Sequence, residues 1–175
     1  QLKFGEPVSL RGSNEIWHYR NKIHLQILYD EGKVRFAYHQ TRNYVSLAPI
    51  GVCFLASATI NDLLADFSKV LEENRMSFVR EVVVRENSQK DELLLVVYLG
   101  SRQDVERLSV LETLTKKHKI KGIVAIVGEK DRQTIFGRDY IETAVGNVKF
   151  HLGAQSFFQI NTPMLEALIA DLINC

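Results

Sequence analysis

Apolar and polar side chains alternate near the start of the chain, over residues 22–29. This period of two is typical of a strand with one buried face. A second run of the same kind, residues 34–38, follows the turn sequence Asp30-Glu31-Gly32. The pattern predicts a β-hairpin with one solvent-exposed face. Its first strand would bury Ile23, Leu25 and Ile27.

Two later segments repeat their apolar residues at helical spacing. Residues 58–75 have them three and four apart, which is the stripe of an amphipathic helix. Residues 104–117 have an apolar side, begin with acidic residues and end with basic ones, as the helix macrodipole favours. We therefore predict a helix in each. The apolar positions are Ile60, Leu63, Leu64, Phe67, Val70 and Leu71 in the first, and Val105, Leu108, Leu111 and Leu114 in the second.

Strands are predicted between and after these helices, at residues 78–85, 92–99 and 122–127. The first two are almost continuously apolar, which indicates a sheet covered on both faces or a central place in the sheet. Between residues 34 and 127 the elements follow the order strand, helix, strand, strand, helix, strand. This is the order of a ferredoxin-like split β-α-β unit, with two helices on one face of an antiparallel sheet. The predicted fold class is α+β.

The last third of the chain adds a hairpin and a helix. Residues 140–145 and 148–152 flank Gly146-Asn147, a two-residue connection with the glycine first, as a type II′ turn prefers. Thr162 is the predicted N-cap of the final helix, with Pro163 at its first position. The apolar stripe of this helix must be buried against something. It consists of Leu165, Leu168, Ile169 and Leu172.

Composition fits a single folded domain. The 175 residues are 46% hydrophobic and have a net charge of +1, which neither requires nor excludes a nucleic-acid partner. No uncharged apolar run approaches the ~20 residues that span a bilayer, and no secretion signal begins the chain. We expect a cytoplasmic protein. Cys53 and Cys175 are far apart, so free thiols are expected.

The most informative segment, residues 154–162, has the sequence Ala-Gln-Ser-Phe-Phe-Gln-Ile-Asn-Thr. Two adjacent aromatic rings and an amide near a helix start offer a stacking surface, hydrogen bonds and a terminal dipole. These features suit a flat heteroaromatic ligand. The alternative is the end of a strand whose phenylalanines belong to the core.

Three stretches resemble the RNA uracil-5-methyltransferase family. Trp17 and the following Tyr19-Arg20-Asn21-Lys22 resemble the opening strand of the family's central domain. Residues 135–139 resemble a short turn in which Gly137 would allow an unusual backbone angle. Residues 153–162 are similar to the family's Phe-Phe-Gln segment almost position for position. The resemblance spans the chain loosely and is close at residues 17–22 and 136–162.

The resemblance implies an enzyme that makes 5-methyluridine with S-adenosylmethionine. In the family, a cysteine thiolate adds to carbon 6 of a flipped-out uracil, which makes carbon 5 nucleophilic. By resemblance, Gln159 would contact S-adenosylmethionine and Phe157 would line the uracil pocket. Arg20 and Lys22 would share a strand face and contact RNA phosphates, although such residues are also common on solvated faces. The expected substrate is 23S ribosomal RNA, with transfer RNA as the other possibility.

The resemblance also predicts how the domains are arranged. Residues 1–161 would form the central RNA-facing α+β domain, and residues 162–175 would begin a linker helix toward a cofactor-binding methyltransferase domain. The nucleophilic cysteine and the base would lie beyond residue 175. Cys175 would not be that nucleophile, because no glycine-rich turn precedes it. The 175-residue chain alone is therefore expected to be inactive.

Several features remain open to more than one interpretation. Cys53 matches one ligand of a 4Fe-4S cluster found in some members, but a lone cysteine beside Phe54 and Leu55 is more often a small buried hydrophobe. The lysines at positions 116, 117, 119 and 121 could contact RNA or complement a helix dipole. The five histidines have no metal-ligand spacing. The alternative functions are a non-catalytic ferredoxin-like RNA-binding module and a protein-interaction domain.

Overall fold

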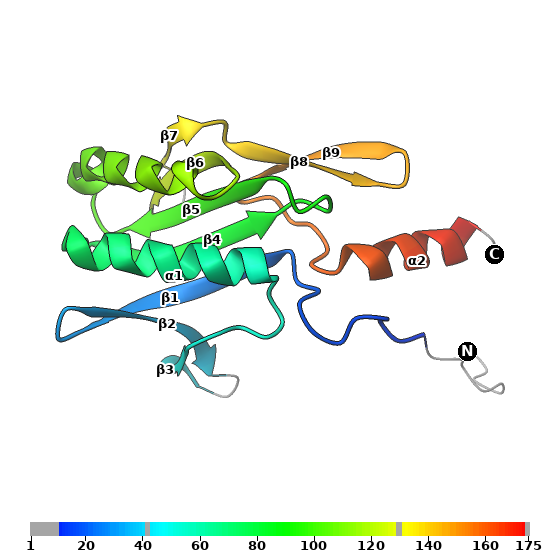
Figure 1. The fold of residues 1–175 in the computed structure, drawn as a ribbon, viewed down its shortest axis with the longest axis horizontal. Coiled ribbons are helices and arrows are strands. Elements are labelled where there is room, and N and C mark those ends of the chain that lie inside the picture. Colours follow the sequence, from blue (N-terminus) through cyan, green and yellow to red (C-terminus); the bar gives the residue numbers. More distant parts are fainter. Residues whose placement is uncertain (1–10, 41–42, 129–130, 174–175) are drawn as a thin grey trace.

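A twisted seven-stranded sheet organises the chain in the computed structural model, which describes residues 11–40, 43–128 and 131–173 (Figure 1). The sheet strands are β1 (Lys22–Asp30), β2 (Lys33–Gln40), β3 (Asn43–Ile50), β4 (Val79–Glu86), β5 (Leu93–Leu99), β6 (Ile120–Val127) and β7 (Asp131–Gly137). A separate hairpin contains β8 (Tyr140–Val145) and β9 (Val148–Gly153). The helices are α1 (Ala58–Glu73), η1 (Arg102–Lys116) and α2 (Thr162–Ile173). None of the helices in the described residues is both long and apolar enough to span a bilayer.

The two faces of the sheet are covered by different elements. Val82 and Val84 of β4 point to the larger core, which also contains the buried residues of α1 and η1. Val83, between them, points to a second core with Ile141 and Leu152 of the β8–β9 hairpin. Both faces of β4 and β5 are therefore buried, which confirms the prediction from their continuous apolar runs.

The strand order is β3-β2-β1-β4-β5-β6-β7, and all neighbours are antiparallel except β5 and β6. The α+β class is confirmed. The ferredoxin-like detail is not, because η1 connects two directly adjacent parallel strands with no strand between them. The edge strands β3 and β7 were not predicted. β7 is mostly exposed, and Val45 of β3 is 91% exposed, so neither strand shows the alternation of a half-buried strand.

The second predicted helix exists, but it is a 3₁₀-helix over its 15 residues. Its buried residues are Val105, Leu108, Leu111 and Leu114, which are spaced three apart. A 3₁₀-helix has three residues per turn and aligns this spacing along one edge, whereas an α-helix would rotate it away from the sheet. Hydroxyl groups also donate to carbonyls three residues earlier, as from Thr113 to Val110 at 2.8 Å.

The start of α2 differs from the prediction, because the N-cap is Asn161 and not Thr162. The Asn161 side-chain oxygen accepts from the Met164 N–H at 3.2 Å, and its carbonyl accepts from the Leu165 N–H at 3.1 Å. Thr162 is the first helical residue. Its hydroxyl accepts a hydrogen bond from Asn21 instead. An asparagine serves as well as a threonine at an N-cap, so the sequence pattern fits either register.

The apolar stripe of α2 is not buried by the described residues. Leu168 is 52% exposed and Leu172 is 67% exposed. Figure 1 shows α2 extending beyond the end of the sheet. Cys175 lies outside the described residues.

Two glycines allow β6 to cross the chain that leads from β7 into the hairpin. Gly137 has a positive φ of 62°, as predicted, and a Cβ there would lie 2.1 Å from the Lys121 carbonyl oxygen. A Cβ on Gly122 would lie 1.7 Å from the Arg138 carbonyl oxygen. Gly146 also has a positive φ, of 55°, in the predicted two-residue turn between Val145 and Val148. The hairpin prediction is confirmed.

The substitution Gly137→Ala should destabilise the fold strongly, whereas Gly146→Ala should cost only about 1 kcal/mol. Both positions have positive φ, but only Gly137 combines it with a backbone clash. Urea unfolding of the two variants separates these effects. Equal losses of unfolding free energy would show that the crossing is looser than the structure indicates.

Candidate functional site

The Phe-Phe-Gln segment lies between β9 and α2, where its two rings have different surroundings. Phe157 is 85% exposed. Phe158 packs against the second core, with its ring centre 5.5 Å from that of Phe150. Gln159 is exposed. One ring therefore belongs to the core, and the other ring and the amide remain available to a ligand.

Asn21 holds this segment in place. Its backbone N–H donates to the Ile160 carbonyl at 3.0 Å, and its side-chain amide donates to the Thr162 hydroxyl at 2.9 Å and to the Gln159 carbonyl at 3.3 Å. The two stretches that most closely resemble the family, residues 17–22 and 136–162, thus meet in space. We call residues 157–161 with Asn21 the Phe-Gln corner.

Arg85 of β4 also holds this segment in place, although it was not predicted from the sequence. This β4 arginine is 2% exposed, and its guanidinium donates to the Ser156 carbonyl. The Ser156 hydroxyl in turn accepts from the Gly153 N–H at 3.1 Å. A charged residue directly after three valines was the available signal, since buried arginines are rare unless they have a role.

Lys22 and Arg85 lie directly opposite each other on neighbouring antiparallel strands, β1 and β4. Burial lowers the pKa of both side chains, and the charge of Arg85 lowers the pKa of Lys22 further. Among the described residues, neither forms an ion pair with an acidic side chain. Like charges in opposed positions destabilise a sheet, so this pair gives the surface beside the Phe-Gln corner a local positive potential.

Arg20 does not continue the strand that contains Lys22. The chain bends at Asn21, and Arg20 forms an isolated bridge with Ala56. The strand alternation that predicted a shared face for Arg20 and Lys22 therefore does not extend to Arg20. Its Nε atom is buried and has no hydrogen-bond partner.

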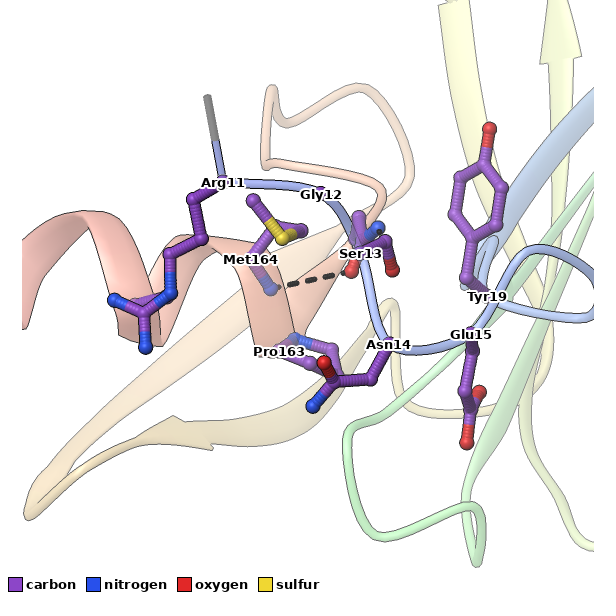
Figure 2. A pocket seen from close by; sticks show the side chains of 10 residues that line it. Arg11, Gly12, Ser13, Asn14, Glu15, Tyr19, Pro163 and Met164 are labelled. Carbon is purple, nitrogen blue, oxygen red and sulfur yellow. Dashed lines mark hydrogen bonds between the residues drawn. The ribbon is translucent and has the colours of Figure 1, made fainter. Parts of the chain in front are cut away.

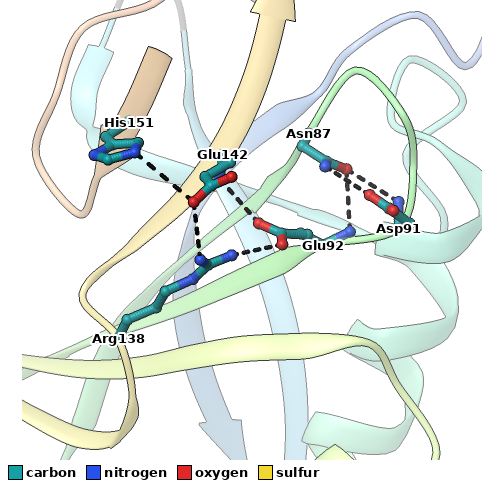
Figure 3. A network of polar contacts seen from close by, with 6 residues as sticks. All are labelled: Asn87, Asp91, Glu92, Arg138, Glu142 and His151. Carbon is teal, nitrogen blue, oxygen red and sulfur yellow. Dashed lines mark hydrogen bonds and ion pairs between the residues drawn. The ribbon is translucent and has the colours of Figure 1, made fainter. Parts of the chain in front are cut away.

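A polar network fixes the hairpin that precedes the corner (Figure 3). Glu92 accepts from the Arg138 guanidinium at 2.5 Å and from the Glu142 N–H at 2.9 Å. Arg138 also binds the Glu142 carboxylate at 3.2 Å, and His151 lies 3.8 Å from it. These contacts hold the turn at residues 135–139 against β5 and β8. They thereby fix the position of the segment that follows β9.

A cavity of about 280 Å³ lies between residues 11–19 and the start of α2 (Figure 2). Asn161, Met164 and Tyr19 contribute to its walls. The Asn161 amide donates to the Ser13 hydroxyl at 3.4 Å across it. The cavity adjoins the Phe-Gln corner, because Asn161 belongs to both.

Cys53 has the surroundings of a buried thiol. It is 8% exposed within the larger core, and its Sγ lies 3.5 Å from the Tyr38 hydroxyl. The Asn61 side chain accepts from the Cys53 N–H and donates to the Cys53 carbonyl, at 3.0 Å each. Within the part of the chain that the structure describes, no group of three or more histidine, cysteine, aspartate or glutamate side chains is arranged to hold a metal.

The basic residues near the end of η1 have in part a structural role. The Lys117 ammonium lies 2.5 Å from Asp66 of α1, and the buried His118 lies 2.9 Å from the same carboxylate. Contacts with Lys117 and His118 lower the pKa of Asp66 well below its usual range. Lys116, Lys119 and Lys121 are exposed.

Comparison with known proteins finds relatives that are named RNA methyltransferases. No family model matches the chain. It is 23% identical to an uncharacterized RNA methyltransferase of Oceanobacillus iheyensis and 24% identical to one of Halalkalibacterium halodurans, over 90% of this chain and 38% of each relative. A third, from Enterococcus faecalis, is 25% identical over the same shares. The chain thus spans well under half the length of these relatives.

A solved structure has the same fold. The tRNA (uracil-54, C5)-methyltransferase of Pyrococcus abyssi, in complex with S-adenosyl-L-homocysteine, superposes with a TM-score of 0.71 at 18% identity. The match covers 93% of this chain and 42% of that protein. Sequence relatives and fold together confirm the resemblance of this chain to the RNA uracil-5-methyltransferase family.

Proposed function

We propose that this chain is the central, RNA-facing domain of an enzyme that methylates carbon 5 of a uracil in RNA, with 23S ribosomal RNA as the expected substrate. The observation that carries the proposal is the Phe-Gln corner. Phe157 is 85% exposed, although large aromatic side chains are usually buried. A target base stacked on this ring would cover it.

Residues in and beside the corner have distinct parts in this proposal. Phe157 stacks on the uracil, and the Gln159 carboxamide contacts S-adenosylmethionine, which supplies the methyl group. An exposed carboxamide fits that role, because it can donate to or accept from polar groups of the cofactor. Lys22, with Arg85 behind it, attracts a phosphate of the same strand. Arg20, bent away from β1, is a weaker candidate for such a contact.

The proposal assigns residues 1–161 to the RNA-facing domain and residues 162–175 to the start of a linker helix. The exposed apolar side of α2 would then pack against the methyltransferase domain, which would also supply the nucleophile. The 175-residue chain alone would transfer no methyl group. A 4Fe-4S cluster with Cys53 as one ligand stays a prediction; the core packing of its thiol favours a structural role.

A non-catalytic RNA-binding module is the second candidate. Such a module would use exposed aromatic residues on an open sheet as its stacking surface. Here the β8–β9 hairpin covers the second face over β5 and β6, which weakens that hypothesis. Trp17 and Phe54 are exposed and lie 6.1 Å apart, edge to face, so they offer an alternative stacking surface.

The substitution Phe157→Ala should weaken binding of a short uridine-containing single-stranded RNA by about tenfold, because stacking on an aromatic ring contributes roughly 1–3 kcal/mol per base. Fluorescence anisotropy measures this. Phe54→Ala is the matched control, since it also removes an exposed phenylalanine. Equal losses in both variants, or a loss in Phe54→Ala alone, would favour the RNA-binding module.

The substitution Lys22→Gln should weaken RNA binding and yet stabilise the fold, by up to about 1 kcal/mol, because it removes the repulsion from Arg85. The folded state lowers the pKa of Lys22, so the repulsion is fully present at neutral pH and declines as pH rises through that lowered pKa. The gain in stability should shrink accordingly. Thermal unfolding between neutral and alkaline pH measures it.

Lys119→Gln is the charge-matched control. Lys119 is an exposed member of the basic cluster near the end of η1, which consists of Lys116, Lys117, Lys119 and Lys121. It should leave stability unchanged. If Lys119→Gln weakens RNA binding more than Lys22→Gln does, the RNA binds at that basic cluster and not beside the Phe-Gln corner.

A further inference from the structure

A second cavity, of about 100 Å³, lies beside Asn21, which contributes to its wall. Its walls come from Glu15 and residues 18–21, from the β4–β5 turn with Lys90, and from the start of α2. Two charged side chains in these walls have buried atoms without a hydrogen-bond partner, namely Oε1 of Glu86 and Nε of Arg20. Glu86 is only 2% exposed.

Such atoms are unusual in a folded protein. Burying a carboxylate oxygen or a guanidinium N–H without a partner is unfavourable, and most buried polar atoms are paired. Among the described residues, no ion pair joins Glu86 to Arg20, although both line this cavity. An acceptor and a donor thus remain unpaired around one small space.

The walls of the cavity are held rigidly. The Asn87 side-chain oxygen accepts from the Asp91 and Glu92 N–H groups at 3.0 Å each, which fixes the β4–β5 turn (Figure 3). The Ser88 N–H donates to the Thr143 hydroxyl of β8 at 3.1 Å. On the opposite wall, a His18 ring nitrogen lies 2.8 Å from the Ala56 carbonyl oxygen. The cavity is therefore formed before a ligand arrives.

The unpaired atoms define the chemistry of the occupant. It must donate a hydrogen bond to Glu86 and accept one from Arg20. A backbone phosphate could accept from Arg20 or Lys90 in the walls, but it has no N–H or O–H to donate to the Glu86 carboxylate, and an apolar group would leave both atoms unpaired. The edge of a nucleobase presents N–H donors beside carbonyl or ring-nitrogen acceptors, and is flat enough for a narrow space.

We propose that this cavity binds a second unpaired nucleobase of the RNA, next to the base that stacks on Phe157. The inference rests on the proposed function. Asn21 contributes to the cavity wall and also binds the Gln159 and Ile160 carbonyls, so the two base sites would share one residue. The protein would then select RNA by the spacing between the target base and this second base.

Nuclear magnetic resonance of the isotope-labelled chain tests the cavity without any substitution. The four nucleoside 5′-monophosphates are titrated separately, with ribose 5-phosphate as the control. At least one nucleotide should shift the backbone amide signals of Asn87 and Ser88, and ribose 5-phosphate should not. Equal shifts with ribose 5-phosphate would show a phosphate site, and no shifts would show a cavity filled by water alone; either result overturns the proposal.

A variant pair then links the cavity to RNA. Glu86→Gln should weaken binding of a single-stranded RNA about fivefold, because a charge-assisted hydrogen bond becomes a neutral one. Glu112→Gln removes the same charge from an exposed site on η1 and should leave binding unchanged or slightly tighter. Equal behaviour of the two variants would overturn the proposal.

The outcomes separate this proposal from the function on which it rests. If RNA binding depends on Phe157 but not on Glu86, the proposed function stands and the second base site is wrong. If nucleotides shift the Asn87 and Ser88 signals but RNA binding does not depend on Phe157, the cavity is a base site and the role of the corner is wrong.

Discussion

The structure of the candidate site depends on one asparagine. Asn21 precedes β1, and its backbone and side-chain N–H groups donate to Gln159, Ile160 and Thr162, in the chain that leads into α2, 138 to 141 residues later. That chain lies outside the strand ladders, so these bonds and the contact from Arg85 hold it in place. They leave Phe157 and Gln159 facing solvent while Phe158 is anchored in the core. The arrangement costs little entropy on binding, because the corner is ordered beforehand.

The sheet makes this corner possible by burying both faces of its central strands β4 and β5. Helices α1 and η1 cover one face of these strands, and the β8–β9 hairpin covers the other face over β4, β5 and β6. The hairpin can cross β6 only because Gly122 and Gly137 have no side chains at the crossing. Stability is lost at the site itself, where Lys22 opposes Arg85 and where Glu86 and Arg20 have unpaired buried atoms. Unfavourable polar groups that cluster around one surface are typical of binding sites, where a ligand supplies the missing partners.

Much of this fold could be predicted from the sequence, because its central strands and helices bury regular patterns. The alternation in β1, the stripe of α1 and the Gly146 turn were sufficient for their elements. The edge strands β3 and β7 bury too little to leave a pattern. The 3₁₀ geometry of η1 was recognisable only from the strict spacing of its apolar residues, and strand order depends on contacts between residues far apart in sequence. Phe157 and Gln159 could be identified by resemblance. The roles of Asn21, Arg85 and Glu86 required the structure, because they too depend on contacts between residues far apart in sequence.

The central claim is that RNA approaches the ring of Phe157, and photochemical cross-linking tests it most directly. A single-stranded RNA in which uridine is replaced by 4-thiouridine would be bound to the chain and irradiated, and the attached peptide identified by mass spectrometry. The account predicts that the cross-linked peptide contains Phe157 and Gln159. Cross-links confined to the lysines after η1, or to Trp17 and Phe54, would contradict it.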